Sequence, residues 1–161
     1  MLKFTFDKPQ SEALHLICLG AHSDDIEIGC GGALLKLIAT YPNISITWVV
    51  FSAIAKRADE ARGSAEEFLR DVQNKHIVLK EFRDGYFPAN VSEIKDVFEE
   101  LKVTASPDLI LTHYRNDLHQ DHRQLCELTW NTWRDHLILE YEIPKYEEIW
   151  ATRIFLLRWR M

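Results

Sequence analysis

The sequence predicts an α/β fold with a mostly parallel β-sheet. Short apolar runs alternate along the chain with longer segments whose apolar residues recur at helical spacing. This alternation is typical of strands joined by crossover helices. The chain has 161 residues, of which 47% are hydrophobic, and contains no repeat, low-complexity tract or linker. We therefore expect one domain, residues 1–161, with a substantial core.

The first half of the chain contains two predicted strands, each followed by a helix. Residues 13–21 (ALHLICLGA) form an apolar run that ends at a glycine turn, which indicates a buried strand. Residues 31–39 (GGALLKLIA) predict a helix that Pro42 stops. Residues 44–51 (ISITWVVF) are β-branched and aromatic, so they predict a second strand. Residues 57–72 are charged and alanine-bearing, and they predict the next helix.

The second half repeats this order. Residues 76–79 (HIVL) predict a third strand, and residues 92–103 predict a helix with Ser92 as its N-cap. Residues 109–112 (LILT) predict a fourth strand, and a further helix is expected from residue 120 to about residue 137. Ligands of such sheets bind outside the carboxyl ends of the strands, so the segments after the first and fourth strands are the candidate site.

Composition excludes several classes of function. The net charge is −6 and no basic run is present, which argues against nucleic-acid binding. No stretch approaches the ~18 apolar residues of a membrane span, and the N-terminus has no apolar signal core. The cysteines, Cys18, Cys30 and Cys126, lack the spacing of a disulfide framework. A cytoplasmic protein with reduced, structural thiols is expected.

Two polar segments carry candidate chemistry. Residues 21–32 (AHSDDIEIGCGG) place a histidine and two carboxylates at a strand end, before glycines that permit a tight turn and a close backbone approach. Residues 113–122 (HYRNDLHQDH) hold three histidines and two aspartates. A hydrolytic zinc site needs three such ligands, an open position for water and a carboxylate that takes the proton. Together the two segments supply that set.

Spacing suggests how these residues divide the work. His22 and Asp25, with two residues between them on a turn, can converge on one metal ion, while Asp24 would point elsewhere and could act as a base. His119 and His122 lie at i and i+3 near a helix start, so they face one side. One of these two histidines can bind metal while the other faces substrate.

Each feature also has a structural interpretation. Acidic residues at a turn are usually solvated or capping. His113 could equally be a satisfied strand-end histidine, and His15, His76 and His136 fit structural roles. The glycine run does not match the dinucleotide-binding pattern G-x-G-x-x-G.

Three segments resemble motifs of the PIG-L/LmbE-like family of zinc-dependent de-N-acetylases. Residues 21–32 are similar to A-H-P-D-D-E-x-x-G-x-G-G, residues 57–61 (RADEA) to R-x-x-E-A, and residues 119–122 (HQDH) to H-x-D-H. The likeness runs from about residue 14 to residue 147. Ser23 replaces the usual proline, and Ile26 replaces the usual glutamate, which weakens any role at that position.

The resemblance implies a Rossmann-like three-layer sandwich that removes the N-acetyl group of an N-acetylglucosamine-type amino sugar, a small-molecule substrate. It implies zinc as the cofactor and homo-oligomers as an available assembly. It also implies a role for each of seven residues: His22, Asp25 and His122 as zinc ligands, Asp24 as general base, His119 for the oxyanion and the leaving amine, Asp121 to orient a histidine, and Arg57 to contact substrate.

Two other functions stay open: a metal-dependent hydrolase of another bond, such as a phosphoester, and a non-catalytic metal- or sugar-binding module. The C-terminal residues bear on the second alternative, the non-catalytic module. Residues 148–161 (EIWATRIFLLRWRM) depart from the family sequence. A shifted reading frame of the gene would permit Gly-Asp-Leu-Gly-His-Pro-Asn, which is the sequence that the family has at this point. We predict a frameshift near codon 148 that truncates the domain. The alternative is a genuine divergent strand at residues 153–159.

Overall fold

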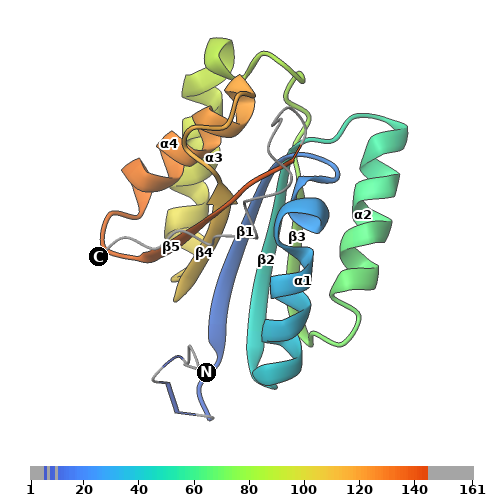
Figure 1. Ribbon diagram of the computed structural model, residues 1–161, viewed down its shortest axis with the longest axis vertical. Coiled ribbons are helices and arrows are strands. Elements are labelled where there is room, and N and C mark those ends of the chain that lie inside the picture. The colour runs from blue at the N-terminus through green and yellow to red at the C-terminus, as the bar shows by residue number, and fades with distance from the viewer. Residues whose placement is uncertain (1–5, 7, 10, 145–161) are drawn as a thin grey trace.

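The computed structural model describes residue 6, residues 8–9 and residues 11–144. Its centre is a sheet in which every neighbouring pair of strands is parallel (Figure 1). The strand order is β3-β2-β1-β4-β5. The predicted α/β fold with a parallel sheet is confirmed. The strands are β1 (Leu14–His22), β2 (Ile44–Ser52), β3 (Asn74–Leu79), β4 (Leu109–His113) and β5 (Leu137–Tyr141).

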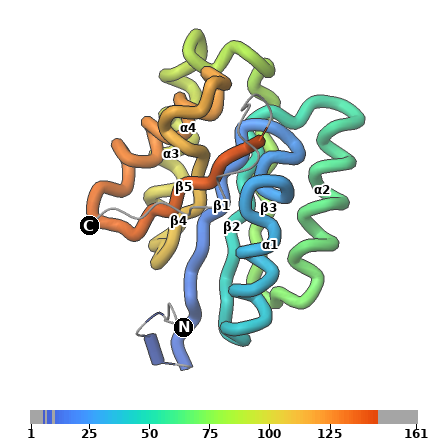
Figure 2. The backbone as a smooth tube through the Cα atoms, in the orientation of Figure 1, coloured from blue at the N-terminus to red at the C-terminus, as the bar shows by residue number. Residues whose placement is uncertain are grey.

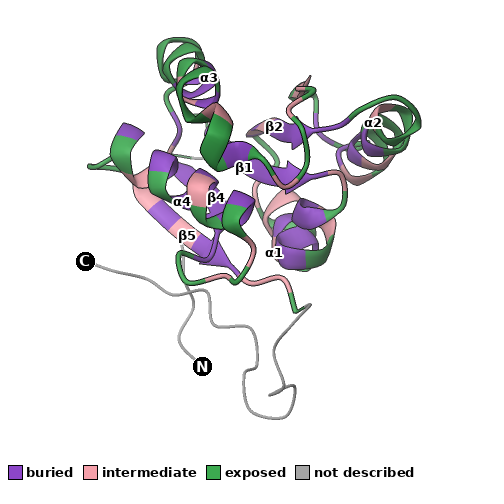
Figure 3. Ribbon diagram, turned by 90° about the horizontal axis from the view of Figure 1, so that it is seen from above, coloured by how far each residue is buried: buried purple, intermediate pink, exposed green. Residues whose placement is uncertain are grey.

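Helices cover both faces of the sheet and make three layers (Figures 1 and 3). Helices α1 and α2 pack with the strands in one apolar cluster, whereas α3, α4 and η1 pack with them in a second cluster on the opposite face. The three-layer prediction is therefore confirmed. The helices are α1 (Asp25–Thr40), α2 (Lys56–Phe68), the 3₁₀ helix η1 (Phe87–Asn90), α3 (Val91–Thr104) and α4 (Gln120–Thr132).

The central strands are apolar because both of their faces are covered. Along β1, Leu16 and Cys18 belong to the cluster that contains α1 and α2, while Ile17 and Leu19 belong to the cluster of α3 and α4. Side chains alternate between the two faces of a strand, so a strand buried on both sides reads as one continuous hydrophobic run. This is why the run at residues 13–21 could be recognised as a strand.

The glycines after β1 do not form the predicted tight turn. Helix α1 begins at Asp25 rather than at residue 31, so all three glycines lie inside it. A close approach is present at two of them, and a Cβ on the third would meet no atom of the described residues within 4 Å. A Cβ on Gly29 would lie 2.1 Å from the ring of Tyr141, and one on Gly31 would lie 2.9 Å from the ring of Phe68. The glycines therefore let β5 and α2 approach α1.

Two predicted boundaries in the second half are wrong. The helix expected to reach residue 137 ends at Thr132, and the residues after it form the edge strand β5. The sequence of β5, LILEY, contains one β-branched residue and several good helix formers, so local propensity favours a helix while pairing with β4 decides for a strand. Ser92 is not an N-cap, because α3 begins at Val91 and follows η1 without a break.

The chain changes direction in the sheet between β1 and β4. It builds β1, β2 and β3 outward in one direction, then crosses back to place β4 on the other side of β1 (Figure 2). The carboxyl ends of β1 and β4 therefore meet at a topological switch point, the usual ligand position in such sheets. Within the described residues, no helix combines the length and apolarity needed to cross a membrane. The predicted aberrant tail, residues 148–161, and with it the frameshift, lie outside the described residues.

Candidate metal centre

Three side-chain atoms form a compact triangle at this switch point. His22 Nδ1 lies 3.2 Å from His122 Nε2 and 3.3 Å from Asp25 Oδ2, and the third side, His122 Nε2 to Asp25 Oδ2, is 3.4 Å. Ligand atoms bound at ~2.0–2.1 Å to one tetrahedral zinc ion are separated by roughly 3.3–3.4 Å. The triangle therefore has the dimensions of one face of a zinc tetrahedron, and the nitrogen and oxygen donors suit that metal.

Local structure sets these atoms in place. His22 is the last residue of β1 and Asp25 the first of α1, and Asp25 Oδ2 accepts a hydrogen bond of 2.7 Å from the backbone N–H of His22. This hydrogen bond links the end of β1 to the start of α1. His122 lies in the first turn of α4, which follows β4. All three residues are buried.

The charges around the triangle favour a cation at its centre. Burial by itself raises the pKa of Asp25, but the neighbouring histidines outweigh burial and hold this pKa far below its usual range. Burial lowers the pKa of His122, whereas the carboxylates of Asp117 and Asp25 outweigh it and raise the pKa to about 9. A positive charge is thus stabilised between these groups, and a metal ion would supply it in place of the proton.

Two carboxylates that sequence reasoning missed contact the outer nitrogens of the histidines. Asp117 Oδ2 lies 3.0 Å from His122 Nδ1, an ion-pair contact outside hydrogen-bond geometry. Asp84 Oδ1 lies 3.0 Å from His22 Nε2. Carboxylates in such positions orient metal-binding imidazoles and raise their basicity. Asp117 belongs to the polar run 113–122 and could have been noticed, whereas Asp84 stands in a loop without any histidine.

Asp121 is fully buried, and its carboxylate mainly accepts hydrogen bonds from backbone N–H groups. Its Oδ2 accepts a hydrogen bond of 2.6 Å from Gly85 N, and its Oδ1 accepts one of 3.1 Å from Phe87 N. Asp121 Oδ2 is also 3.4 Å from His22 Nε2, so the predicted contact with a histidine exists but is long. The residue thereby fastens the loop that carries Asp84 to the start of α4.

His119 is the N-cap of α4, and its Nδ1 accepts a hydrogen bond of 3.2 Å from Asp121 N. Because a backbone N–H can only donate, the proton of the neutral ring is on Nε2. The ring centroid lies 4.8 Å from that of His22 and 4.6 Å from that of His122. Burial and these two histidines lower the pKa of His119. The structure thus places a neutral N–H donor beside the triangle.

Asp24 and Arg57 lie at the surface. Asp24 is the N-cap of α1, and its exposed carboxylate makes no hydrogen bond or ion pair with any described residue. Arg57 is the second residue of α2 and is also exposed. No hydrogen bond or ion pair between described residues joins Arg57 to the triangle, so the structure does not bring it into the cluster.

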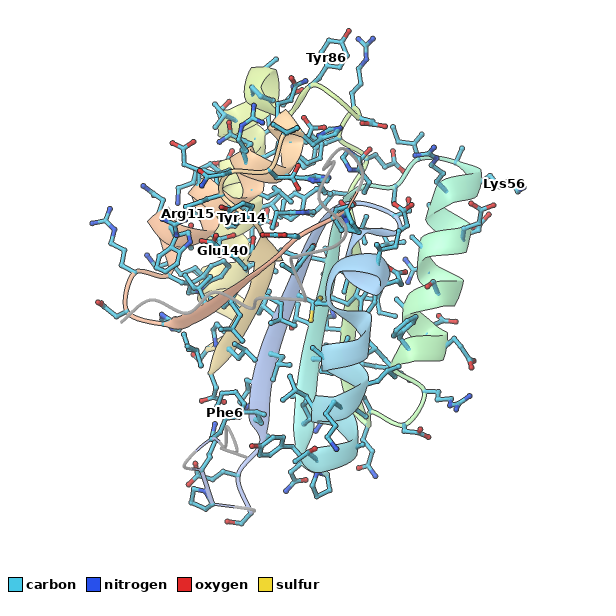
Figure 4. The ribbon with its side chains drawn as sticks, viewed as in Figure 1. Phe6, Lys56, Tyr86, Tyr114, Arg115 and Glu140 are labelled. Atoms are coloured by element: carbon cyan, nitrogen blue, oxygen red, sulfur yellow. The ribbon has the colours of Figure 1, made fainter. Side chains whose placement is uncertain are left out.

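The loop after β4, which carries Asp117 and His119, is anchored at its base. Figure 4 shows Tyr114, Arg115 and Glu140 side by side. Glu140 of β5 accepts hydrogen bonds from Arg115 Nε at 2.9 Å and from Trp130 Nε1 at 2.8 Å. Its other oxygen accepts one of 3.2 Å from the backbone N–H of Arg115. This buried carboxylate therefore ties the loop to β5 and α4.

Asp117→Asn is expected to weaken zinc binding about 10- to 100-fold, because His122 loses the charge that raises its basicity. The amide can still accept from the backbone N–H of His119, a bond of 2.7 Å in the wild type, so the loop should keep its shape. Competition with a chromophoric chelator would measure the dissociation constant. Asp96→Asn, on α3 away from the cluster, is the matched control, and equal affinity in both variants would contradict the role given to Asp117.

Residues 17–133 match the family model of PIG-L, GlcNAc-PI de-N-acetylase. The chain belongs to this family. The match includes most of β1, all of α4 and every residue of the triangle. The resemblance seen in three short motifs thus extends over most of this chain.

Solved structures share this fold at low identity. N,N'-diacetylchitobiose deacetylase from Pyrococcus horikoshii, complexed with its inhibitor, is 19% identical with a TM-score of 0.58, and the match covers 86% of this chain and 64% of that one. The zinc-inhibited form of teicoplanin deacetylase is 14% identical with a TM-score of 0.66, covering 81% and 68%. A 4-carboxy-2-hydroxymuconate hydratase from Pseudomonas putida is 14% identical with a TM-score of 0.54, covering 82% and 67%.

These likenesses show the fold alone, and the fold is common to deacetylases and a hydratase. This PIG-L chain spans about two thirds of the length of these proteins. The reaction therefore has to be argued from the side chains of the site.

Proposed function

We propose that the chain is a zinc-dependent N-deacetylase that hydrolyses the N-acetyl group of an N-acetylglucosamine-type amino sugar and releases acetate. The observation that carries this proposal is the triangle of His22, Asp25 and His122, with sides of 3.2–3.4 Å, in a member of the PIG-L family. These three residues would hold the zinc ion. When bound, zinc polarises the amide carbonyl and makes a water molecule acidic near neutral pH.

Asp24 is the proposed general base. It directly precedes the ligand Asp25, and its carboxylate is exposed and has no partner among the described residues. A base without a competing hydrogen bond can take the proton of the attacking water. The same proton is then available for the nitrogen of the leaving amine, which balances the hydrolysis.

His119 is proposed to stabilise the oxyanion. A neutral ring that carries its proton on Nε2 can donate to the negative oxygen that develops as water attacks. The hydrogen bond from Asp121 N to Nδ1 occupies the nitrogen at which the ring would take a second proton. This arrangement supports the ring as a hydrogen-bond donor to the oxyanion. Proton delivery to the leaving amine, which the family resemblance implies for His119, is here proposed for Asp24.

Arg57 stays the predicted substrate contact. It follows β2 at the carboxyl edge of the sheet, and its exposed guanidinium is unpaired within the described part of the chain. A free guanidinium there could donate to sugar hydroxyls or to an anionic group on the conjugate. A cytoplasmic location, the absence of a nucleic-acid partner and the formation of homo-oligomers also stay predictions.

Acetate release tests the proposal against both rivals. The chain, loaded with one equivalent of zinc, is expected to release acetate from at least one N-acetylglucosamine derivative in a panel with nucleotide, lipid, thiol and peptide conjugates. A chelator should abolish the release, and zinc should restore it. Bound zinc without acetate release from any conjugate would favour a non-catalytic module. Cleavage of a phosphoester substrate instead would favour the other hydrolase.

A further inference from the structure

His113, the last residue of β4, lies next to the triangle and supplies none of its three atoms. Its side chain is fully buried and contacts two members of the triangle. The ring of His113 stacks on that of His122 with centroids 4.0 Å apart and planes inclined by 12°. Its Nε2 lies 3.3 Å from Asp25 Oδ2. From sequence alone this residue could equally have been a satisfied strand-end histidine.

The third member of the triangle is reached through the backbone. The N–H of Ala21 donates a hydrogen bond of 3.0 Å to His113 Nε2, and Ala21 directly precedes His22 in β1. Since a backbone N–H can only donate, Nε2 accepts and the neutral ring carries its proton on Nδ1. The ring thus holds the end of β1 at the residue before a proposed zinc ligand.

His113 is not explained as core filling. Its Nδ1 is buried without a hydrogen-bond partner, an uncommon and unfavourable state for a polar atom. A leucine would fill such a strand position without an unpartnered nitrogen. The ring is also fixed from behind, where Tyr141 lies with its centroid 4.8 Å away and its hydroxyl donates a 2.6 Å hydrogen bond to Leu19 O. Gly29 leaves the space that the tyrosine ring occupies.

We propose that His113 is a positioning residue of the metal centre. Its flat face fixes the ring plane of His122, and its Nε2 fixes the end of β1 and therefore His22. Together these contacts keep the triangle at the separation that one zinc ion requires. This inference rests on the proposed function, because it assumes that the triangle binds zinc.

Three substitutions separate the two contacts. His113→Phe keeps a flat ring against His122 and removes the acceptor for Ala21 N–H. His113→Gln keeps an acceptor and removes the ring. His113→Ala removes both. We expect the zinc dissociation constant to rise about 10- to 100-fold for alanine, as for other groups that orient metal ligands, and by less for phenylalanine and glutamine. The fall in kcat at subsaturating zinc should be reversed by excess zinc, with KM little changed.

The control is Thr112→Val in the same strand. Thr112 is fully buried, and its hydroxyl is hydrogen-bonded at 3.0 Å to that of Thr129 in α4, on the other face of the sheet. This variant should lower the unfolding temperature of the metal-free protein without changing its zinc affinity. A merely structural role for His113 would give the same pattern.

The outcomes separate the two proposals. Failure of the wild-type chain to bind zinc would overturn the proposed function itself. If the wild type binds zinc and the folded His113 variants bind it equally tightly, only the positioning role is overturned. Circular dichroism identifies the variants that fold. If the alanine variant does not fold, the zinc dissociation constants of the glutamine and phenylalanine variants decide the question.

Discussion

His122→Ala is expected to lose zinc and, with it, acetate release. His122 supplies one corner of the triangle, and two further groups of potential ligands, one with His22 and His119 and one with Asp25 and His113, also contain it. Its loss therefore removes a ligand from the triangle and from both of these groups, and among the described residues it leaves intact only the group of His22, Asp84, His119 and Asp121. Removal of a ligand should cost more than the ~100-fold that removal of an orienting partner costs. Zinc content after dialysis against a mild chelator, with turnover on the same sample, measures both losses.

Two other histidines serve as controls. His76→Ala changes an exposed residue of β3 and should leave the zinc content and turnover unchanged. His119→Ala should keep one equivalent of zinc and lose turnover, because His119 is proposed to act on the oxyanion rather than on the metal. A full equivalent of zinc in dialysed His122→Ala would show that the ligand assignment is wrong.

The sequence predicted which candidate residues lie together at the edge of the sheet, whereas it missed the edge strand β5. Strands β1 and β2 are long apolar runs, and their burial on both faces leaves a pattern that local reading can recognise. The metal-centre candidates follow directly after β1 and β4, and parallel strands bring their carboxyl ends to one edge. The convergence of His22 and His122 could thus be inferred before any distance was known.

What could not be predicted depends on contacts between distant segments. Strand β5 has no strong strand propensity and is a strand because it pairs with β4. Asp84 reaches His22 because Asp121, on α4, binds the backbone of Gly85 in the next loop position. None of these contacts has a signal within its own stretch of sequence.

The division of labour between Asp24 and Asp25 gives the sharpest test of the mechanism. The two side chains are chemically identical and adjacent, so only their directions distinguish them. Asp25 is 4% exposed and its Oδ2 lies within 3.4 Å of nitrogens of His22, His113 and His122. The Asp24 carboxylate is exposed and makes no hydrogen bond or ion pair with any described residue. The proposed base is thus the N-cap of α1, and the proposed ligand is the first residue of that helix.

Asp24→Asn should keep one equivalent of zinc and lose turnover by at least the ~10²-fold that loss of a general base costs, because an amide cannot take the proton of the attacking water. Asp25→Asn should lose both zinc and turnover, because a neutral amide is a weak zinc ligand and removes the charge that the histidines surround. Each variant is the control for the other, since both remove one carboxylate charge from the same turn. Metal analysis and acetate release on matched samples give the comparison. Equal loss of zinc in both variants would mean that the two carboxylates share the metal, and the base would then have to be sought elsewhere in the site.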